Sequence, residues 1–583
     1  MKNFQIAREF ELMADVLELK GENPFRIRAY RRAAQNLQSL GEDVEVLARE
    51  DRLEDIPGVG ADLAGKIQEF LRTGQIKEIA ATSKGIPRGV VELMNIPGVG
   101  PRTARMLYER EHVTGLDQLE KLARKGGLRG LPGIQAKTEQ NILKGIRLVR
   151  GGQERMPLGR ALPLGRELIH QLERLSAVKQ ICLAGSLRRM KETVGDIDIL
   201  VTSTQPAAVM RAFVSLPQVA DVLERGSTKG SIRHKEGIQV DLRVVDPECF
   251  GAALMYFTGS KQHNIRIRDI GVKKGLKISE YGVFKASTGR RLVSATEEEV
   301  YAAVGLPWIA PELREDAGEI DAALQRKLPD LVALEDIRGD LHCHTNATDG
   351  HHTIEALVSA AERRGYKYVA VTDHSPSTRV AGGLSAAELA AHVRKIRAVQ
   401  ARHPRITVLA GSECDILPDG SLDYPDRVLA ELDLVIASVH AAFKQSRSEM
   451  TRRICRALAH PRVHVLGHPT GRLIGERDPY AVDIDEVLRT ARRYDKAMEI
   501  NSYPDRLDLN DAHARRAHEL GVRVAVSTDT HMLDHLDFME LGVATARRGW
   551  TETPQVVNTW SASKLLAWLR AERAAPPRAA HGR

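Results

Sequence analysis

The second half of the chain repeats a pattern that strongly limits how it can fold. Short apolar segments end directly in a histidine, aspartate or glutamate, as in YVAVTDH (368–374), ITVLAGSE (406–413) and VHVLGH (463–468). Helical sequence separates these segments. Polar side chains at the carboxyl ends of successive strands are how a (β/α) barrel builds its site. The pattern therefore predicts a barrel whose strand ends share one site.

The polar residues of this pattern form a set typical of metal ligands. The nine candidates are His342, His344, Asp349, His374, Glu413, His440, His468, Asp529 and His531. One histidine of this kind is more often structural, but nine in register favour metal binding. Nitrogen and oxygen donors without cysteine suit two or three ions of Zn²⁺, Mn²⁺ or Fe²⁺.

Other polar residues near these positions lack such a place at a strand end. We expect His351, His352, His392 and His464 to lie on the surface or behind the ligands. For Asp340, Cys343 and Cys414, which stand beside ligands, supporting or core positions are expected rather than ligation.

A second group of acidic residues lies in the middle of the chain, in the segment CLAGSLRRMKETVGDIDILV (182–201). Asp196 and Asp198 are two apart on an expected strand, so both carboxylates point to the same face. Asp241, in the alternating segment GIQVDLRVV, supplies a third carboxylate if that strand pairs alongside. Like charges so close together need cations between them, and hard oxygen ligands suit Mg²⁺ or Mn²⁺. Two such ions would activate a hydroxyl and stabilise a leaving pyrophosphate.

The first 150 residues contain a repeat. IPGVG occurs at 56–60 and again at 96–100, a looser copy, LPGIQ, begins at Leu131, and helical sequence follows each copy. Glycines leave no Cβ between the backbone and a ligand, and a following helix offers free N–H groups to a phosphate. One such turn is usually only a turn, but three favour binding to a DNA backbone. The three copies resemble helix-hairpin-helix motifs. Residues 101–150 carry 11 basic and 5 acidic side chains, which fits phosphate contact.

Charge and histidine are unevenly distributed along the chain. Residues 1–300 contain 48 Lys and Arg against 38 Asp and Glu, while residues 301–583 contain 37 against 39, and 16 of the 20 histidines. This division favours a polyanion-binding front and a metal-binding back over chance clustering of solvated charge. Acidic residues near the start argue against a signal peptide, and no apolar run approaches the roughly 18–20 residues of a membrane span. Five cysteines in 583 residues predict a reducing, cytoplasmic setting.

The middle segment resembles the nucleotidyltransferase palm of family X DNA polymerases, the DNA polymerase beta type. Gly-Ser, a spacer, GDxD and a distant third aspartate carry the resemblance, together with YFTGS at 256–260. It implies that Asp196, Asp198 and Asp241 are catalytic. It also implies nucleotide-binding residues, which are Ser186, Arg189, Gly195, Tyr256, Phe257, Gly259, Lys261 and Asn264. Arg268 would lie near the template, and Arg243 follows the third aspartate as in the family.

Two positions depart from the family. Gln239 stands where the family often has an arginine that supports the carboxylates, so a different side chain would orient them. Lys261 replaces an aspartate that lies by the nucleotide base, where it would stack on the base, reach a phosphate, or remain solvated. Residues 251–291 hold 9 basic and 2 acidic residues, as expected of a groove along a template.

The amino-terminal segment contains NPFRIRAYRRAA (23–34), followed by IPGVGADLAGKIQEFLRTG (56–74). These sequences resemble the small family X domain that binds the 5′ side of a gap. The glycines expected at DNA are Gly58, Gly60, Gly98 and Gly100. Lys66 aligns with the family's Schiff-base lysine. A lyase lysine needs a lowered pKa, which Arg26 and Arg31 would favour, but Asp62 replaces a family lysine. The alternatives for Lys66 are a DNA-phosphate contact or a helix-surface lysine.

The back half resembles the PHP (polymerase and histidinol phosphatase) domain. The resemblance implies a 3′–5′ exonuclease, with 3′-phosphatase or abasic-site cleavage as further options, and a hydroxide that attacks a phosphoester. The fold class we expect is helical helix-hairpin-helix domains, an α+β palm and a distorted (β/α)7 barrel. The expected boundaries are 1–85 for the gap-binding domain, 86–150 for a second helix-hairpin-helix domain, 151–250 for the palm, 251–312 for the nucleotide-binding subdomain, 313–336 for a partly helical linker, 337–570 for PHP and 571–583 for a disordered tail.

These features predict a polymerase that fills short gaps in base excision repair and trims 3′ ends in its PHP domain. The expected partners are gapped or primer-template DNA and dNTPs, with no membrane, and the chain is expected to be a monomer. One alternative is a binding or scaffold protein with a degenerate palm, against which the intact carboxylates argue. Another is a small-molecule phosphatase, which would gain nothing from tandem helix-hairpin-helix turns.

Overall fold

The computed structural model describes residues 2–38, 40, 44–84, 86–96, 99–132, 134, 135, 138–140, 142, 143, 145, 146 and 155–571. The chain divides into two compact units, Met1–Arg155 and Met156–Arg583, which we describe separately. All but the first residue of the predicted tail, 571–583, falls outside the described residues.

The first unit is helical. Its elements are α1 (Lys2–Lys20), α2 (Pro24–Gln38), α3 (Val44–Arg49), η1 (Leu53–Asp55), α4 (Ala61–Thr73), α5 (Lys77–Ser83), α6 (Arg88–Glu92), η2 (Leu93–Asn95), α7 (Pro101–Glu111) and α8 (Leu116–Arg124). Apolar faces of the first helices meet in one core, where the Phe10 and Tyr30 rings pack edge to face at 5.5 Å. A second core includes Leu93, Val99 and Leu107.

The two IPGVG copies share one backbone hydrogen bond among their described residues. The Val59 N–H donates to the Ile56 carbonyl at 2.9 Å, and the Val99 N–H donates to the Ile96 carbonyl at the same distance. Gly60 and Gly100 then cap α4 and α7. The third copy repeats the first bond, from the Ile134 N–H to the Leu131 carbonyl at 3.1 Å. Gly58 has a φ of +82°, a backbone conformation that favours glycine. Gly98 lies outside the described residues.

The second unit begins with a five-stranded sheet of order β2-β4-β7-β6-β5. The strands are β2 (Gln180–Leu183), β4 (Asp196–Thr202), β5 (Val219–Arg225), β6 (Lys229–His234) and β7 (Gln239–Val245). The short β1 (Met156–Pro157) pairs with β3 (Thr193–Val194), and the helices are α10 (Leu158–Glu173), α11 (Gly185–Arg188) and α12 (Pro206–Val214). In β4 and β7, Ile197, Ile199 and Val240 are buried, while the residues between them are not fully buried. The alternation of a strand thus keeps the carboxylates on the opposite face from the core.

The segment after this sheet folds into helices and a small antiparallel sheet. Its elements are η3 (Pro247–Cys249), α13 (Phe250–Thr258), α14 (Lys261–Lys273), β8 (Leu276–Ser279), β9 (Gly282–Lys285), β10 (Arg291–Val293) and α15 (Glu297–Ala303). The predicted linker is partly helical, with η4 (Pro311–Leu313), α16 (Glu319–Leu324) and η5 (Leu334–Asp336). It is also packed, because Leu313 and Ile320 join the core of this segment and the side chain of Arg314 is 0% exposed.

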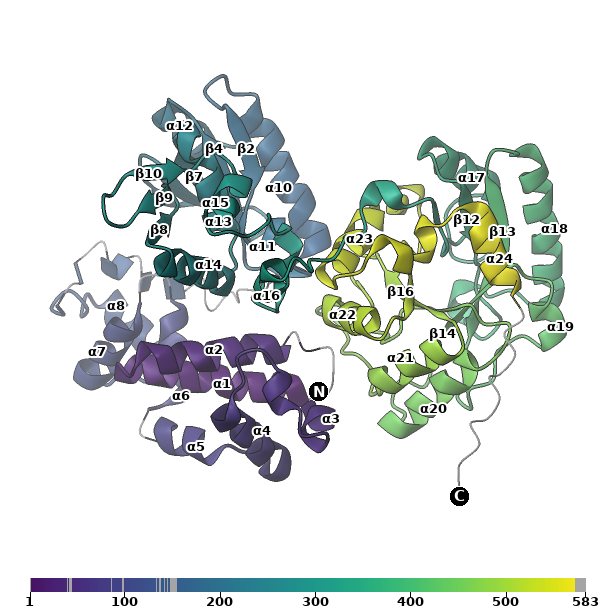
Figure 1. Ribbon diagram of the computed structural model, residues 1–583, viewed down its shortest axis with the longest axis horizontal. Coiled ribbons are helices and arrows are strands. Elements are labelled where there is room, and N and C mark those ends of the chain that lie inside the picture. The colour runs from purple at the N-terminus through teal and green to yellow at the C-terminus, as the bar shows by residue number, and fades with distance from the viewer. Residues whose placement is uncertain are drawn as a thin grey trace. The chain divides into compact units, whose positions relative to one another are not determined.

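Seven parallel strands follow in the order of the sequence, which confirms the predicted barrel. They are β11 (Gly339–Asp340), β12 (Tyr368–Val371), β13 (Thr407–Asp415), β14 (Leu434–Ser438), β15 (Val465–Leu466), β16 (Ala497–Asn501) and β17 (Arg523–Ser527). A parallel bridge from Cys343 to Thr530 brings the last strand against the first. Figure 1 shows the strands surrounded by helices, which are α17 (Ile354–Arg363), α18 (Ala386–Arg402), α19 (Asp426–Leu429), α20 (Arg447–Leu458), α21 (Ile484–Arg493), α22 (Asp511–Glu519), α23 (Met539–Arg548) and α24 (Ala562–Arg570). Short 3-10 turns complete the unit, η6 (Arg379–Ala381), η7 (Leu533–Phe538), η8 (Thr553–Gln555) and η9 (Val557–Thr559).

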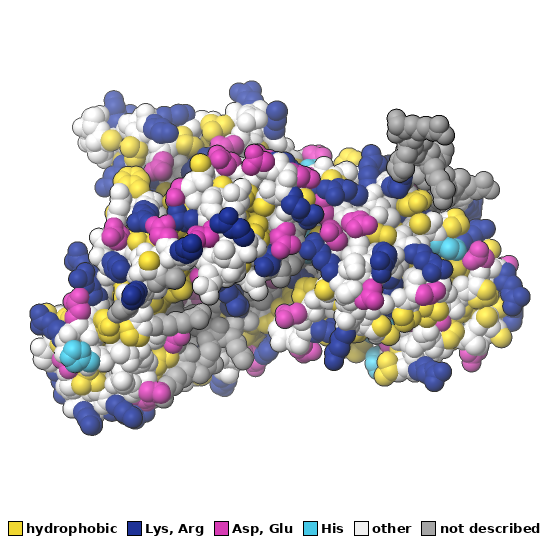
Figure 2. Space-filling view, turned by 90° about the horizontal axis from the view of Figure 1, so that it is seen from below, with side chains coloured by type: hydrophobic (Ala, Val, Ile, Leu, Met, Phe, Trp, Pro, Cys, Tyr) yellow, Lys and Arg dark blue, Asp and Glu magenta, His cyan; other side chains and the backbone are white. Residues whose placement is uncertain are grey.

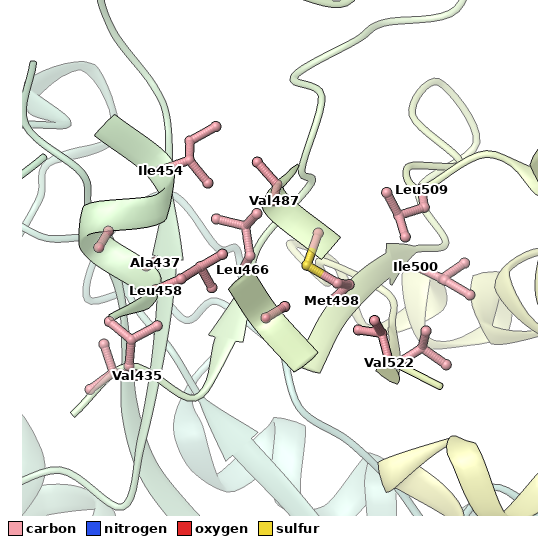
Figure 3. Close-up of a cluster of buried hydrophobic side chains, with 14 of the residues drawn as sticks. Val435, Ala437, Ile454, Leu458, Leu466, Val487, Met498, Ile500, Leu509 and Val522 are labelled. Atoms are coloured by element: carbon pink, nitrogen blue, oxygen red, sulfur yellow. The ribbon is translucent and has the colours of Figure 1, made fainter. Parts of the chain in front are cut away.

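The barrel core lies between these strands and their helices. In Figure 3, Leu466 and Met498 on the strands lie close to Leu458 and Val487 on α20 and α21. Burial of such side chains contributes roughly 1.5–3 kcal/mol each. This core fixes the strand ends that carry the predicted ligands.

Basic side chains are spread over the face drawn in Figure 2 and are mixed with acidic ones, whereas few histidines show on it. His342 and His344 are fully buried. Among the described residues, no helix is long and apolar enough to cross a membrane.

Two candidate metal centres

The first centre is the carboxylate group of the palm. β4 and β7 pair in parallel with Asp198 opposite Asp241, and one oxygen from each of Asp196, Asp198 and Asp241 lies within 4.8 Å of the others. Burial, together with the neighbouring Asp196 and Asp241 carboxylates, raises the pKa of Asp198 to about 7. The unfavourable charge and the three hard oxygen donors fit divalent cations such as Mg²⁺ or Mn²⁺.

Gln239 takes part in orienting this group. Its side-chain amide donates to Asp241 Oδ1 at 2.9 Å. Although Gln239 replaces the family arginine, it still donates one hydrogen bond to the third carboxylate. Arg243, two residues after Asp241, instead lies over the Phe257 ring at 4.7 Å from its centroid.

The turn from β2 into α11 lies directly against the carboxylates. Gly185 has a φ of +60°, and a Cβ built there would lie 1.9 Å from Asp198 Oδ2. The Ala184 N–H also donates to the Asp198 carbonyl at 2.8 Å. Only glycine leaves room for the carboxylate at this point.

Two arginines at the end of α11 are held by buried acids. Arg189 donates from Nε to Glu315 Oε1 at 3.0 Å and from Nη1 to the Thr258 carbonyl at 2.5 Å. Arg188 forms a bidentate pair with Glu297 at 2.8 and 2.9 Å. A Cβ on Gly259 would lie 3.2 Å from Arg189 Nη1, so two of the predicted nucleotide-binding residues are neighbours.

Four of the remaining predicted nucleotide-binding residues lie on α13 and α14. The Tyr256 and Phe257 rings are 5.2 Å apart, and Asn264 Nδ2 donates to the Tyr256 carbonyl at 2.7 Å. Asn264 Oδ1 is buried without a hydrogen-bond partner among the described residues, which leaves it able to accept a bond from a ligand. Arg268 donates to the Asn264 carbonyl at 3.3 Å, and Lys261 is exposed at the start of α14. Ser186 lies in α11, and Gly195 directly precedes β4.

The second centre lies at the carboxyl ends of the barrel strands. The ligands form three overlapping sets, and within each set one donor atom from every residue lies within 4.8 Å of the others. The sets are His344, Asp349, His374 and His531; His342, His344 and Asp529; and His374, Glu413 and His440. Eight of the nine predicted ligands are therefore brought together. The ninth, His468, lies beside them, with Nε2 2.7 Å from Glu413 Oε1.

The electrostatics of these side chains fit ligands for cations. Burial and the neighbouring His374 and His531 lower the pKa of His344 to about 4, so its imidazole is neutral at pH 7. Against the opposing effect of burial, Glu413 raises the pKa of His374 to about 10 and that of His440 to about 9. In the described chain, His342 Nε2 and His344 Nδ1 are buried without hydrogen-bond partners, and His344 Nε2 lies 3.1 Å from Asp529 Oδ1. Buried imidazole nitrogens beside carboxylates suit bound Zn²⁺, Mn²⁺ or Fe²⁺.

The amino-terminal unit places Lys66 on α4, where its side chain is 9% exposed. Its ammonium pairs with Asp62 and lies 3.0 Å from Glu78 Oε2. Burial lowers the pKa of Lys66, but the bonds to these two carboxylates outweigh it and raise the pKa above its usual value. This direction is opposite to the one that a Schiff-base lysine needs. The low exposure also disfavours a simple helix-surface lysine.

Comparison with known proteins places these features in a family. The chain is 38% identical to the DNA polymerase/3′-5′ exonuclease PolX of Bacillus subtilis (strain 168) over 572 residues, which are 98% of this chain and 100% of that protein. The chain belongs to the family X DNA polymerases that carry a PHP domain. It is also 29% identical to rat DNA polymerase lambda over 54% of this chain and 56% of that protein. A probable phosphatase of Thermoanaerobacter sp. (strain X514) is 27% identical over 40% of this chain and 95% of that protein.

Family profiles match the parts of this family X enzyme in the predicted order. The helix-hairpin-helix domain matches residues 1–76, and the SAM-like helix-hairpin-helix tandem matches 90–148. The DNA polymerase beta thumb matches 253–315, and the PHP domain matches 340–503.

Several side chains behind the PHP ligands were not predicted. Glu499 accepts from His342 Nδ1 at 2.7 Å, and Asp415 accepts from His440 Nδ1 at 3.0 Å. Such carboxylate–histidine bonds fix the orientation of a ligating ring. Glu499 lies in KAMEIN (496–501), an apolar strand signal that could have revealed β16.

Other residues near the PHP centre match the supporting places expected for them. His392 Nε2 lies 2.7 Å from Asp373 Oδ2, and Asp340 accepts a hydrogen bond from the Thr528 hydroxyl. Arg506 was also not predicted, and its Nε lies 3.6 Å from Asp529 Oδ2, so a cation stands at the edge of the ligand group. His464 is buried and accepts from the Val435 N–H at 3.0 Å, away from the ligands.

Proposed function

We propose that this family X enzyme is a DNA-directed DNA polymerase that fills short gaps in base excision repair and removes nucleotides from 3′ ends in its PHP domain. The observation that carries the polymerase part is the group of Asp196, Asp198 and Asp241 on two parallel strands, with one oxygen of each within 4.8 Å. The 38% identity to the Bacillus subtilis DNA polymerase/3′-5′ exonuclease over the whole length supports both activities.

In the polymerase centre, the chain's own groups bind and orient the reactants. Asp196, Asp198 and Asp241 would hold Mg²⁺ or Mn²⁺, and Gln239 keeps the Asp241 carboxylate oriented. When bound, such cations activate the primer 3′-hydroxyl and neutralise charge on the leaving pyrophosphate. Ser186, Arg189, Gly195 and Gly259 would bind the triphosphate of a dNTP. Tyr256 and Phe257 would lie against its sugar, and Asn264 and Lys261 near its base.

In the PHP centre, the nine predicted ligands would hold Zn²⁺, Mn²⁺ or Fe²⁺, and the exonuclease is proposed to depend on Mn²⁺. The neutral His344 imidazole offers a lone pair to a cation, and Glu499 and Asp415 fix the rings of His342 and His440. Arg506 would bind a non-bridging oxygen of the scissile phosphate. The pairing with a polymerase makes a DNA 3′ end the favoured substrate.

The helix-hairpin-helix turns would supply the DNA contacts that carry no sequence information. Gly58, Gly60, Gly98 and Gly100 would let phosphates approach the backbone, and Arg268 would lie near the template. We propose gapped or primer-template DNA and dNTPs as partners, a monomeric state, and a cytoplasmic location. The five free cysteine thiols are compatible with a reducing compartment. Lys66 is left out of the proposed chemistry because its pKa is raised.

The test is a pair of assays on metal-stripped protein, each repeated with Mg²⁺, Mn²⁺ and Zn²⁺. One follows extension of a primer across a one-nucleotide gap, and the other follows loss of 3′-labelled nucleotides from single-stranded DNA. We expect both activities to return with metal. Failure of primer extension with every metal would instead support a scaffold with a degenerate palm.

A second candidate for the PHP domain is phosphatase activity, since a probable phosphatase matches this part of the chain over 95% of its own length. Comparing turnover of histidinol phosphate, a DNA 3′-phosphate and single-stranded DNA separates the possibilities. We expect the two DNA substrates to be preferred, because the tandem turns add affinity only to DNA.

A further inference from the structure

Arg548, the last residue of α23 in the PHP barrel, reaches into the polymerase centre. Its Nη1 donates to the carbonyl of Arg189 at 2.8 Å and to Glu315 Oε1 at 3.1 Å. The same Glu315 oxygen accepts from Arg189 Nε at 3.0 Å. The PHP arginine therefore contacts Arg189 at its backbone and, through Glu315, at its guanidinium.

Arg548 is itself held from the barrel side. Its Nε and Nη2 donate to Asp511 Oδ2, at the start of α22, at 2.9 and 2.6 Å. The neighbouring Arg547 donates to Glu312 Oε1 at 2.7 Å. The end of α23 therefore also binds the segment around Glu312 that carries Glu315. Asp511 of the barrel thus fixes the Arg548 guanidinium, which contacts Arg189 and Glu315 outside the barrel.

This chain of charges is buried. The side chains of Arg548, Glu315 and Arg189 are 5%, 11% and 12% exposed. Against the effect of burial, the cations of Lys191, Arg189 and Arg548 lower the pKa of Glu315, so it is ionised at pH 7. In such surroundings, loss of one partner leaves the others poorly compensated and free to move.

A neighbouring contact between the same two domains serves as a control. Arg472 of the barrel donates to Glu192 Oε2 at 2.7 Å and to the Leu507 carbonyl at 2.6 Å. Glu192 lies only three residues beyond Arg189, but among the described residues its carboxylate pairs with Arg472 and with neither Arg189 nor Glu315. Breaking it loosens the same interface without touching the Arg189 network.

We propose that Arg548 is a positioning residue for nucleotide binding in the polymerase centre, acting through Glu315 and the Arg189 carbonyl. This inference rests on the proposed role of Arg189 in binding the dNTP triphosphate. It makes the PHP barrel a structural part of the polymerase centre, independent of the PHP metals.

The experiment measures gap-filling kinetics with the full-length variants Arg548→Met, Arg548→Lys and Glu192→Gln. For Arg548→Met we expect the KM for dNTP to rise about tenfold while kcat changes less than about threefold. Arg548→Lys keeps one positive charge between Glu315 and Asp511 and should give an intermediate KM. Glu192→Gln should leave KM for dNTP near the wild-type value, and exonuclease activity of Arg548→Met should stay near wild type.

Equal increases of KM in Arg548→Met and Glu192→Gln would overturn the inference, because they would indicate general loosening of the interface. An unchanged KM in Arg548→Met would overturn it as well. If Arg548→Met does not fold, the double variant Arg548→Met/Asp511→Asn removes one charge of each sign and is measured instead. Glu315 keeps Arg189 and Lys191 as partners in that protein.

Arg189→Ala separates this inference from the function on which it rests. If Arg189→Ala leaves the KM for dNTP unchanged, the proposed triphosphate role fails and the inference fails with it. If Arg189→Ala raises KM and Arg548→Met does not, only the inference fails.

Discussion

The two candidate centres of the second unit gather charge in opposite ways. The palm places three carboxylates together, and burial, with their mutual repulsion added, raises the pKa of Asp198 to about 7. The PHP barrel interleaves carboxylates with imidazoles, so that Glu413 lies 3.0 Å from His374 Nδ1 and 3.1 Å from His440 Nε2. The palm carboxylates need cations to relieve their repulsion. In the PHP centre, the neighbouring histidines and carboxylates already balance part of each other's charge.

The difference follows from the strands that build each centre. In the palm, alternation along β4 and register with β7 place several acids on one face of a sheet. In the barrel, six of the seven strands bring ligands at or near their carboxyl ends to one shared site, so that ligands of different chemistry meet. The palm suits exchangeable hard cations, and the barrel suits a held cluster. Because different residues build the two centres, we expect substitutions to remove the two activities separately.

The largest expected effect is loss of nucleotide addition in Asp198→Ala. Removing this carboxylate takes away several kcal/mol of transition-state stabilisation, so gap filling should fall about a thousandfold or more. Exonuclease activity on 3′-labelled single-stranded DNA should remain within about twofold of wild type, since additivity holds for separate sites. Loss of both activities in a folded variant would contradict two independent centres.

The mirror variant is His344→Ala, which removes a residue shared by two of the three PHP donor sets. Exonuclease activity should fall about a thousandfold, while gap filling persists. His464→Ala is a matched control, because this histidine is buried in the same barrel but bonds to the Val435 N–H and lies near the Leu569 carbonyl. Equal loss in both histidine variants would point to damage of the barrel rather than loss of a ligand.

A smaller effect tests how closely the palm backbone approaches its carboxylates. Gly185→Ala places a Cβ 1.9 Å from Asp198 Oδ2, and the required shift should lower the kcat of gap filling about a hundredfold. Gly237→Ala is the control, since Gly237 also has a positive φ, +87°, but open space around its Cβ position. Exonuclease activity provides a second control in each sample. Similar losses in the two variants would assign the effect to backbone strain instead of the clash.

Much of both centres follows from local sequence patterns. The period of a strand predicts that Asp196 and Asp198 share a face, and apolar segments ending in ligands predict the barrel mouth. The contacts that support these residues were not predictable in this way. The Glu499 carboxylate lies inside β16 rather than at its end, so the pattern of strands ending in ligands does not reveal it. Arg548 and Arg189 are 359 positions apart, so no local pattern connects them.

The comparison also predicts opposite effects on stability when metals are removed. In chelator-treated protein, Asp198→Asn removes repulsion and should raise the free energy of unfolding by on the order of 1 kcal/mol. Glu413→Gln removes the acid that compensates the neighbouring histidines and should lower it by about 3 kcal/mol. Urea unfolding of the two variants beside wild type measures both changes. Adding Mn²⁺ should stabilise wild type more than Glu413→Gln, because a tighter-bound ion favours the folded state more strongly. If both variants shift the free energy of unfolding in the same direction, the two centres do not differ in how their charges are balanced. The contrast between exchangeable cations in the palm and tightly bound cations in the barrel would then have no physical basis.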